Sequence, residues 1–293
     1  AGESFYEDKM QPVIDELREK HLLKVDNGAS IVDLSEYSMP PCLILRSDGA
    51  TLYATRDLAA AIYRKNTYDF DKLLYVVAYQ QSLPFKQIFK VLELRGEDWV
   101  KDRVHVSFTD GTLSTRHGRV VFLEDVLNAA IEKTLDVIKE KSPDLEDKET
   151  VARQIGVGAV VWGVVYNGRI KDIVFSWDKA LNFDGETGPY AQYTHARCCS
   201  VLRKSGGYDR AKIDYSALSD EASSALVKAI AEFPAAVSEA AEKYEPYIIS
   251  RSVINVCSCF NKFYYDNRIM DENEGVRNAR LALTDAARNV IKT

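Results

Sequence analysis

The sequence predicts an α/β part followed by an all-helical bundle, and two observations indicate this order. The segment LLYVVAY (73–79) is almost entirely apolar, aromatic or β-branched, and the helical pattern LPFKQIFKVLELRG (83–96) follows it directly. A strand of this kind is typical of a sheet that is buried on both faces. After residue 118 apolar residues recur only at helical spacing. A length of 293 residues favours two domains over one.

Each element has its own signal in the pattern. Residues 3–20 place a few apolar positions among charges, which predicts an amphipathic helix. Short apolar runs around the turn SDGA predict a hairpin of two strands, 42–46 and 51–54. The elements expected next are a helix (55–65), the strand 73–79, the helix 83–96, the strand 103–108 and a long helix (120–141). Polar breaks then interrupt the helical part at 142–149, 182–189 and 204–212.

Composition excludes several classes of protein. The net charge of −6 and the pI near 5.4 argue against a generic nucleic-acid coat, which needs a broad basic surface, but they allow a local basic face. No apolar stretch is long enough to span a bilayer, and the first residues lack a targeting pattern, so we expect a cytoplasmic protein. The five cysteines are not spaced as zinc ligands, which predicts buried or reduced thiols and no metal site.

The string DGATLYATRD (48–57) offers a candidate cation site. Tyr53 and Asp57 are four residues apart, so at the start of a helix they project from one face. A carboxylate accepts two parallel N–H bonds from a guanidinium, which makes arginine-like cations good ligands for this pair. The alternative is that Asp57 only favours the helix macrodipole near an N-terminus.

A second candidate follows the buried strand, where Gln80, Gln81 and Ser82 precede a helix. Ligands of open α/β sheets bind at the carboxyl ends of strands, so Gln81 is placed to hydrogen-bond a substrate amine or amide. The alternative is that Ser82 caps the helix and that the glutamines are solvated.

A third candidate is the glycine-bounded loop DGTLSTRHGRVVF (110–122), which holds Ser114, Thr115, Arg116 and His117. Hydroxyls, a fixed cation and backbone N–H groups are what a polyphosphate needs. The alternative is that Ser114 or Thr115 only caps the next helix.

A fourth candidate lies in GETGPYAQYTHARCCSVLRK (185–204), where Tyr190 and Tyr193 share a helix face near Arg197. Aromatic rings beside arginine are suited to unpaired bases. The string FNKFYYDNRI (260–269) offers Tyr264 and Tyr265 in the same way. Aromatic stripes at helical spacing also occur in cores, so packing is the alternative for both strings.

Taken together, these strings resemble one family. The order YATRD, YVV-x-x-Q-Q-S-L, LSTR-x-G-R-V-V-F-L-E-D and GETGPY-x-QY-x-H-AR is similar to that of arginyl-tRNA synthetases, and the resemblance covers essentially all of the chain. It implies the rear half of a class I nucleotide-binding, Rossmann-like fold followed by an anticodon-binding helical bundle. The implied domains are a partial catalytic domain (1–118), a helical connecting and stem-contact region (119–183) and the anticodon-binding bundle (184–293).

The resemblance also implies roles for the candidate residues. Tyr53, Asp57 and Gln81 match the positions that hold the side chain of substrate arginine. The loop LSTRHG resembles the second class I signature, which implies a catalytic role for Ser114, Thr115 and Arg116 and ATP binding by these residues and His117. The residues implied to contact tRNA are Tyr190, Tyr193, Arg197, Tyr264 and Tyr265.

The implied reaction is the ATP-dependent attachment of arginine to tRNA-Arg by way of arginyl-adenylate. Magnesium would accompany ATP, no tightly bound cofactor is expected, and we expect a monomer.

The sequence also departs from the pattern of this family. No H-x-G-H string matches the first class I signature, so we expect that the chain starts beyond that motif and cannot form the adenylate alone. Thr112 and His117 stand where the family has lysines, and Ala78 and Pro84 replace a usual glycine and histidine. These departures favour an alternative, a degenerate paralogue that binds tRNA without ligase chemistry. A metabolic nucleotide-binding protein is a further alternative to both.

Overall fold

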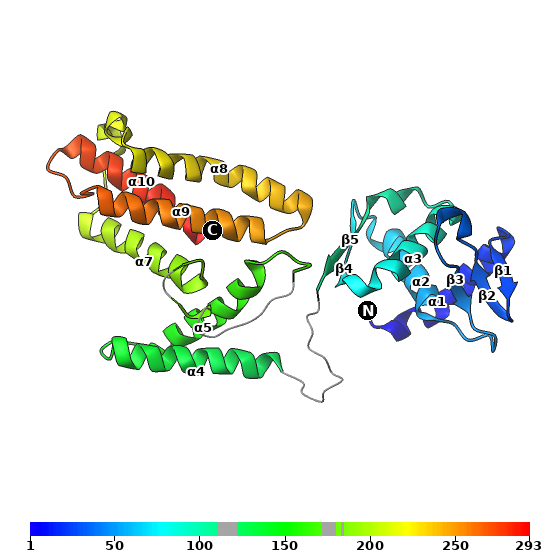
Figure 1. The fold of residues 1–293 in the computed structure, drawn as a ribbon. Coiled ribbons are helices and arrows are strands. Elements are labelled where there is room, and N and C mark those ends of the chain that lie inside the picture. The colour runs from blue at the N-terminus through cyan, green and yellow to red at the C-terminus, as the bar shows by residue number, and fades with distance from the viewer. Residues whose placement is uncertain (110–121, 172–179, 183–184) are drawn as a thin grey trace. The chain divides into compact units, whose positions relative to one another are not determined.

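The computed structural model describes residues 1–109, 122–171, 180–182 and 185–293. The chain forms two compact units, Ala1–Asp110 and Gly111–Thr293. Figure 1 shows strands in the first unit, whereas the described part of the second unit contains only helices. This order confirms the predicted fold class. The division into three domains stays a prediction.

A three-stranded antiparallel sheet follows helix α1 (Glu7–Glu19) in the first unit. Its strands, in spatial order, are β1 (Leu23–Asp26), β2 (Ala29–Val32) and β3 (Cys42–Leu45). Asn27 and Gly28 connect β1 to β2, and both have positive φ, as two-residue hairpin turns require. The helix predicted at 3–20 is confirmed, although α1 begins at Glu7. The strand predicted at 42–46 is confirmed as β3, which ends one residue earlier.

The predicted strand 51–54 is wrong. Thr51 makes only an isolated bridge to Leu45, and helix α2 (Tyr53–Tyr68) begins two residues later. The buried hydroxyl of Thr55 donates to the carbonyl of Ile44 at 2.5 Å, which ties the first turn of α2 to β3. Helix formation at Tyr53 therefore replaces the second strand of the expected hairpin.

A β–α–β unit completes the first part of the chain. Its elements are β4 (Leu73–Ala78), α3 (Ser82–Arg95) and β5 (Arg103–Phe108), and the two strands pair in parallel. This confirms the strands and the helix predicted between 73 and 108. The ring of Tyr75 lies 4.8 Å from that of Phe85 and 5.3 Å from that of Phe89, so α3 covers one face of the strand pair.

The other face of β4 differs from the expectation of burial on both sides. Leu74 is 44% exposed and Val76 is 64% exposed, although both are aliphatic. Parallel sheets are almost always covered on both faces. The sequence predicted that both faces of this strand are covered. Among the described residues, no element covers this second face.

The second unit is a set of packed helices. Figure 1 shows α8 and α9 side by side, and α4 packs against α5. The helices are α4 (Leu123–Lys141), α5 (Lys148–Val165), α7 (Gly188–Ser205), α8 (Glu221–Lys243), α9 (Tyr247–Asp266) and α10 (Glu274–Lys292). Phe260 and Phe263 of α9 are fully buried in the main core of this unit. None of the helices in the described part of the chain is long and apolar enough to cross a bilayer.

The cysteines behave as expected of buried thiols. All five are free, and Cys42, Cys198 and Cys257 are buried. Burial raises the pKa of each of these three thiols to about 12, which disfavours the reactive thiolate. Among the residues for which positions are given, no three His, Cys, Asp or Glu side chains gather as metal ligands.

A glycine allows α4 and α5 to cross closely. A Cβ atom added to Gly156 would lie 2.8 Å from the carbonyl carbon and oxygen of Ala130 and 2.9 Å from the nitrogen of Ile131. These are backbone atoms of α4, so they cannot move without shifting the helix.

We therefore expect Gly156→Ala to lower the free energy of unfolding by about 1–3 kcal/mol, the usual range for overpacking. Alanine favours helix formation by about 1 kcal/mol relative to glycine, so destabilisation would reveal the clash. Gly158→Ala is the matched control, because its Cβ would meet only the end of the Gln192 side chain, which can move. Urea denaturation of both variants tests this, and an unchanged or higher midpoint for Gly156→Ala would contradict it.

Candidate functional site

The predicted arginine-binding residues lie at the start of α2 and just beyond the end of β4. Tyr53 is the first residue of α2 and is 73% exposed. Gln81 follows β4 in a short 3-10 helix (Tyr79–Gln81) and is exposed. Asp57 is half-buried one turn after Tyr53. Among the described residues no hydrogen bond joins these three side chains to one another. The structure therefore does not show them as one connected site.

Asp57 has an environment that fits a cationic ligand. Burial raises the pKa of its carboxyl group above the ordinary value, while Arg64 and Arg56 lower it and Glu3 raises it further. No hydrogen bond of the described structure satisfies this carboxylate. Asp57 is the fifth residue of α2, so it lies beyond the first turn, and the macrodipole explanation for it is weakened. The group is thus partly desolvated and open to an N–H donor.

Two neighbours of Asp57 were missed by the sequence analysis. Tyr75 is only 7% exposed, so its hydroxyl is almost removed from solvent. Burial raises its pKa to about 12, and the negative charge of Asp57 adds to this shift, whereas Arg64 opposes it. The guanidinium of Arg64 lies 5.9 Å from the ring centres of both Tyr6 and Tyr75. No periodicity signal relates Tyr75 to Asp57, because Tyr75 lies in β4, whereas Arg64 is seven residues after Asp57 on α2 and helical spacing could have indicated it.

The remaining residues after β4 follow neither alternative fully. Ser82 is the first residue of α3, and its hydroxyl donates to the carbonyl of Tyr79 at 2.5 Å. Gln81 occupies the N-cap position without a side-chain cap. Ser82 therefore does not cap the helix, so this part of the alternative is wrong, whereas Gln80 and Gln81 are both exposed, as the alternative expected. The loop residues Ser114, Thr115, Arg116 and His117 lie outside the described residues, as does Thr112.

The second unit brings several predicted tRNA-contact residues together. The guanidinium carbon of Arg197 in α7 lies 4.8 Å from the ring centre of Tyr193 and 5.2 Å from that of Tyr264 in α9. Arg197 Nη2 also donates to the Tyr193 hydroxyl at 3.2 Å. Tyr193 is 51% exposed and Tyr264 is 42% exposed, so both rings are accessible beside a fixed cation. Packing alone does not explain these two tyrosines.

A pocket of about 360 Å³ opens beside this arrangement. Its lining includes three basic side chains, the Tyr264 ring and Met270. The basic residues are Arg197 and Lys204 of α7 and Arg268, which follows α9. No Asp or Glu lines the pocket, although the whole chain has a net charge of −6. The pocket therefore suits an anionic ligand with an aromatic portion.

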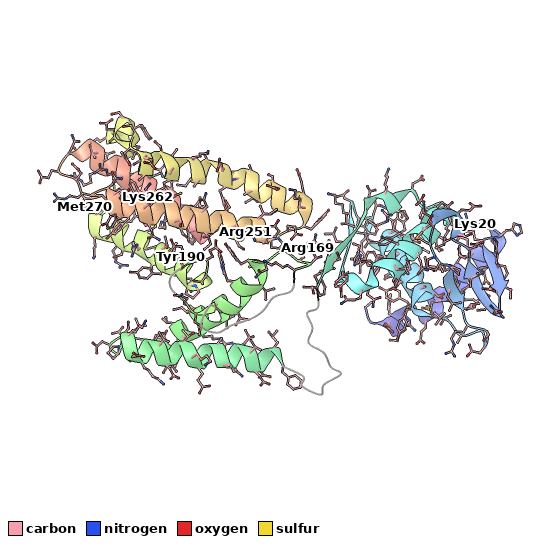
Figure 2. All side chains as sticks on the ribbon, viewed as in Figure 1. Lys20, Arg169, Tyr190, Arg251, Lys262 and Met270 are labelled. Atoms are coloured by element: carbon pink, nitrogen blue, oxygen red, sulfur yellow. The ribbon has the colours of Figure 1, made fainter. Side chains whose placement is uncertain are left out.

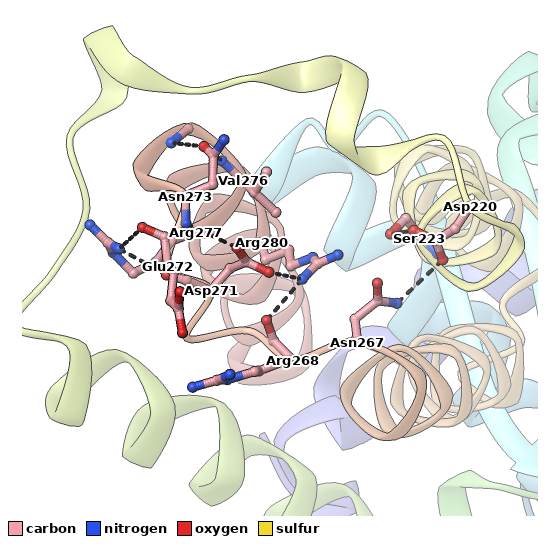
Figure 3. Close-up of polar contacts among 11 residues, drawn as sticks. Asp220, Ser223, Asn267, Arg268, Asp271, Glu272, Asn273, Val276, Arg277 and Arg280 are labelled. Carbon is pink, nitrogen blue, oxygen red and sulfur yellow. Dashed lines mark hydrogen bonds and ion pairs between the residues drawn. The ribbon is translucent and has the colours of Figure 1, made fainter.

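The segment between α9 and α10 is held by hydrogen bonds and an ion pair where it lines the pocket. Arg280 of α10 donates to the carbonyl of Arg268 at 2.9 Å and pairs with Asp271 at 3.1 Å, as Figure 3 shows. Asn267 donates to Asp220 at 3.3 Å, which ties the same segment to the start of α8. The sequence analysis missed Lys204, Arg268 and Met270, because only the turn after α9 brings Arg268 and Met270 beside Lys204 of α7. Figure 2 labels Met270 in this turn.

The other two predicted tRNA-contact residues differ in exposure. Tyr190 packs against a buried cluster that includes Phe233 and Cys257, so its ring is partly in the core. Figure 2 labels it on α7. Tyr265 is 89% exposed and is accessible from solvent. The role of each in binding stays a prediction.

Two family models match successive parts of the chain. The model described as "tRNA synthetases class I (R), catalytic domain" matches residues 1–177, and the "DALR anticodon binding domain" matches residues 191–293. The first match alone covers more than half of the chain. The chain belongs to the arginyl-tRNA synthetase family. The predicted resemblance is thereby confirmed.

Curated relatives agree with this assignment. The chain is 55% identical to an arginine–tRNA ligase of Halothermothrix orenii. The match covers 100% of this chain and 53% of that protein. It is also 55% identical to the arginine–tRNA ligase of Clostridioides difficile, of which it covers 52%. The chain therefore spans about half the length of the arginyl-tRNA synthetases it matches.

Solved arginyl-tRNA synthetases share the fold. The Thermus thermophilus enzyme superposes with a TM-score of 0.87 at 25% identity, covering 97% of this chain and 56% of that one. The Plasmodium falciparum enzyme gives a TM-score of 0.87 at 24% identity, over 100% of this chain and 51% of that one. The second likeness shows the fold alone.

Proposed function

We propose that this chain is part of an arginine–tRNA ligase that binds arginine at Asp57 and tRNA-Arg through the helices of the second unit. The observation that favours it most is the half-buried Asp57 carboxylate, which has no hydrogen bond among the described residues. A guanidinium is the ligand whose paired N–H groups and charge match such a carboxylate. Tyr53 and Gln81 would complete the recognition of arginine.

The tRNA would bind where Arg197, Tyr193 and Tyr264 meet the basic pocket. Unpaired bases stack on aromatic rings and on guanidinium planes, and phosphates favour lysine and arginine. Tyr190 and Tyr265 would extend this surface. Within the proposal the protein is a cytoplasmic monomer.

The proposed reaction consumes ATP with Mg²⁺, and arginine is activated as its adenylate before transfer to tRNA. In this proposal Ser114, Thr115 and Arg116, with His117, stabilise the phosphate groups where negative charge increases in the transition state. Thr112 and His117 lack the charge of the lysines that the family has at these positions. Each charged hydrogen bond lost there would cost about 1.5–3 kcal/mol.

We expect this chain alone to give no arginine-dependent exchange between ATP and pyrophosphate above the background without arginine. The reason is that it spans about half of its relatives, and no H-x-G-H string is present in its sequence to contact ATP. The matched control is a full-length relative assayed under the same conditions, with arginine and tRNA present. Robust exchange by this chain would refute the expectation.

The alternative is a tRNA-binding paralogue without ligase chemistry, which the substitutions at Thr112, His117 and Pro84 favour. The test fuses to this chain the part of a relative that the chain does not cover. If ATP–pyrophosphate exchange is still absent in the fusion, the paralogue is supported. Exchange restored by the fusion would support the ligase. The ligase and the paralogue should both bind tRNA, whereas a metabolic nucleotide-binding protein should not. Titration of labelled tRNA at several salt concentrations separates these cases.

A further inference from the structure

Asn261 of α9 lies at the centre of a hydrogen-bond network that reaches α7. Its carbonyl oxygen accepts from Arg197 Nη1 at 2.5 Å. Its Nδ2 donates to the Tyr190 hydroxyl and to the Thr194 hydroxyl, both at 3.0 Å. The side-chain amide thus uses its oxygen and its nitrogen at once, and all three of its partners come from one helix.

Thr194 determines which way this amide points. Its hydroxyl donates its single hydrogen to the carbonyl of Tyr190 at 2.9 Å, and the residue is fully buried. It can therefore only accept from Asn261, so the nitrogen of the amide must face Thr194 and the oxygen must face Arg197. The flanking residues Phe260 and Phe263 are fully buried, which fixes the position of Asn261 on α9.

The orientation of Arg197 depends on this oxygen. Among the described residues, the guanidinium also contacts the ring and hydroxyl of Tyr193 and the ring of Tyr264. Ring contacts with a cation tolerate many orientations, and the hydrogen bond to the exposed Tyr193 is long at 3.2 Å, whereas the hydrogen bond to Asn261 is short at 2.5 Å and restricts the orientation most. Asn261 thus makes the shorter of the two hydrogen bonds that align the plane of the guanidinium beside the pocket.

We propose that Asn261 is a positioning residue of the tRNA site, which holds the Arg197 guanidinium between Tyr193 and Tyr264 in the orientation that meets RNA. The inference rests on the proposed function, because it assigns Arg197 to tRNA binding. Asn261 itself need not touch the RNA. Its effect on binding passes through Arg197, so removing Arg197 should make Asn261 irrelevant to affinity.

A double-mutant cycle tests this dependence. Affinity for tRNA-Arg is measured at one fixed salt concentration for the wild type, Asn261→Ala, Arg197→Ala and the double variant. We expect each single variant to bind about tenfold more weakly, since a charged contact is lost or misdirected. The double variant should bind no more weakly than Arg197→Ala, because the two residues act as one unit. Asn255→Ala is the control, since Asn255 is an exposed asparagine of the same helix, and it should bind as the wild type does.

The outcomes separate the two proposals. Multiplying losses in the double variant would overturn the role of Asn261 and leave the proposed function standing. A wild-type chain that binds no tRNA would instead overturn the proposed function, and the binding role of Asn261 with it.

A second measurement tests the alignment of Arg197 directly in the free protein, and the same spectra show whether Asn261→Ala keeps its fold. Nitrogen-15 NMR of the arginine side chains reports rotation of the Arg197 guanidinium without RNA. We expect slow rotation in the wild type and in Asn261→Asp, which keeps an oxygen acceptor, and fast rotation in Asn261→Ala. Equal rotation in all three proteins would overturn the inference.

Discussion

Replacing Asp57 with asparagine is expected to lower the affinity of this chain for free arginine by about 100-fold. Truncating one partner of a hydrogen-bonded charge pair typically costs about 2–5 kcal/mol. Because solvent reaches part of the half-buried Asp57 carboxylate, we expect a loss near the lower end of this range. Asparagine keeps the size and one oxygen but loses the charge. Isothermal titration with arginine measures the change directly.

Asp71→Asn is the matched control, because Asp71 is an exposed aspartate in the turn between α2 and β4. It should bind arginine as the wild type does. Affinity should also depend on pH, since only the ionised carboxylate of Asp57 attracts a guanidinium. Burial raises the pKa of Asp57, so binding should weaken as the pH falls through a value above the ordinary aspartate range. An Asp57→Asn variant with unchanged affinity would contradict the proposed arginine site.

Elements with a strong local pattern could be predicted from the sequence. The β-branched run of β4 and the long amphipathic helices of the second unit belong to this group. The β1–β2 hairpin was missed because its strands have four residues each and include the polar Lys24, Asp26 and Ser30. The Asn27–Gly28 pair between them was a usable hairpin signal. Residues 51–54 were predicted as a strand, but the short SDGA turn leads into a helix that begins at Tyr53 instead.

The candidate sites were predicted less completely, because their residues meet only after folding. Asp57 was found within a string, but its surroundings come from Glu3 and Tyr75, 54 and 18 positions away in the numbering. Asn261 meets Arg197 across 64 positions. Periodicity places a residue on a face of one helix, and it does not say which residue of another helix lies opposite. Contacts between side chains of two different helices therefore could not be predicted from the sequence.

The string FNKFYYDNRI contains aromatic residues of two kinds, and substitution should separate them. Phe260 is fully buried and contacts the core shared by α7, α8, α9 and α10, whereas Tyr265 is 89% exposed. Phe260→Ala is expected to lower the free energy of unfolding by about 3–5 kcal/mol, since it removes a large buried ring and leaves a cavity. Urea denaturation followed by circular dichroism measures this loss.

Tyr265→Ala is the matched control, and its unfolding free energy should stay within about 0.5 kcal/mol of the wild type. Its tRNA affinity should fall instead, if an exposed ring at this position stacks on a base. The Phe260 ring centre lies 6.2 Å from that of Tyr264, so Phe260→Ala should also weaken tRNA binding by loosening the support of Tyr264. Equal stability losses in the two variants would contradict the division between core and contact residues. That division is what allows a short aromatic string to serve both the fold of the bundle and its binding surface.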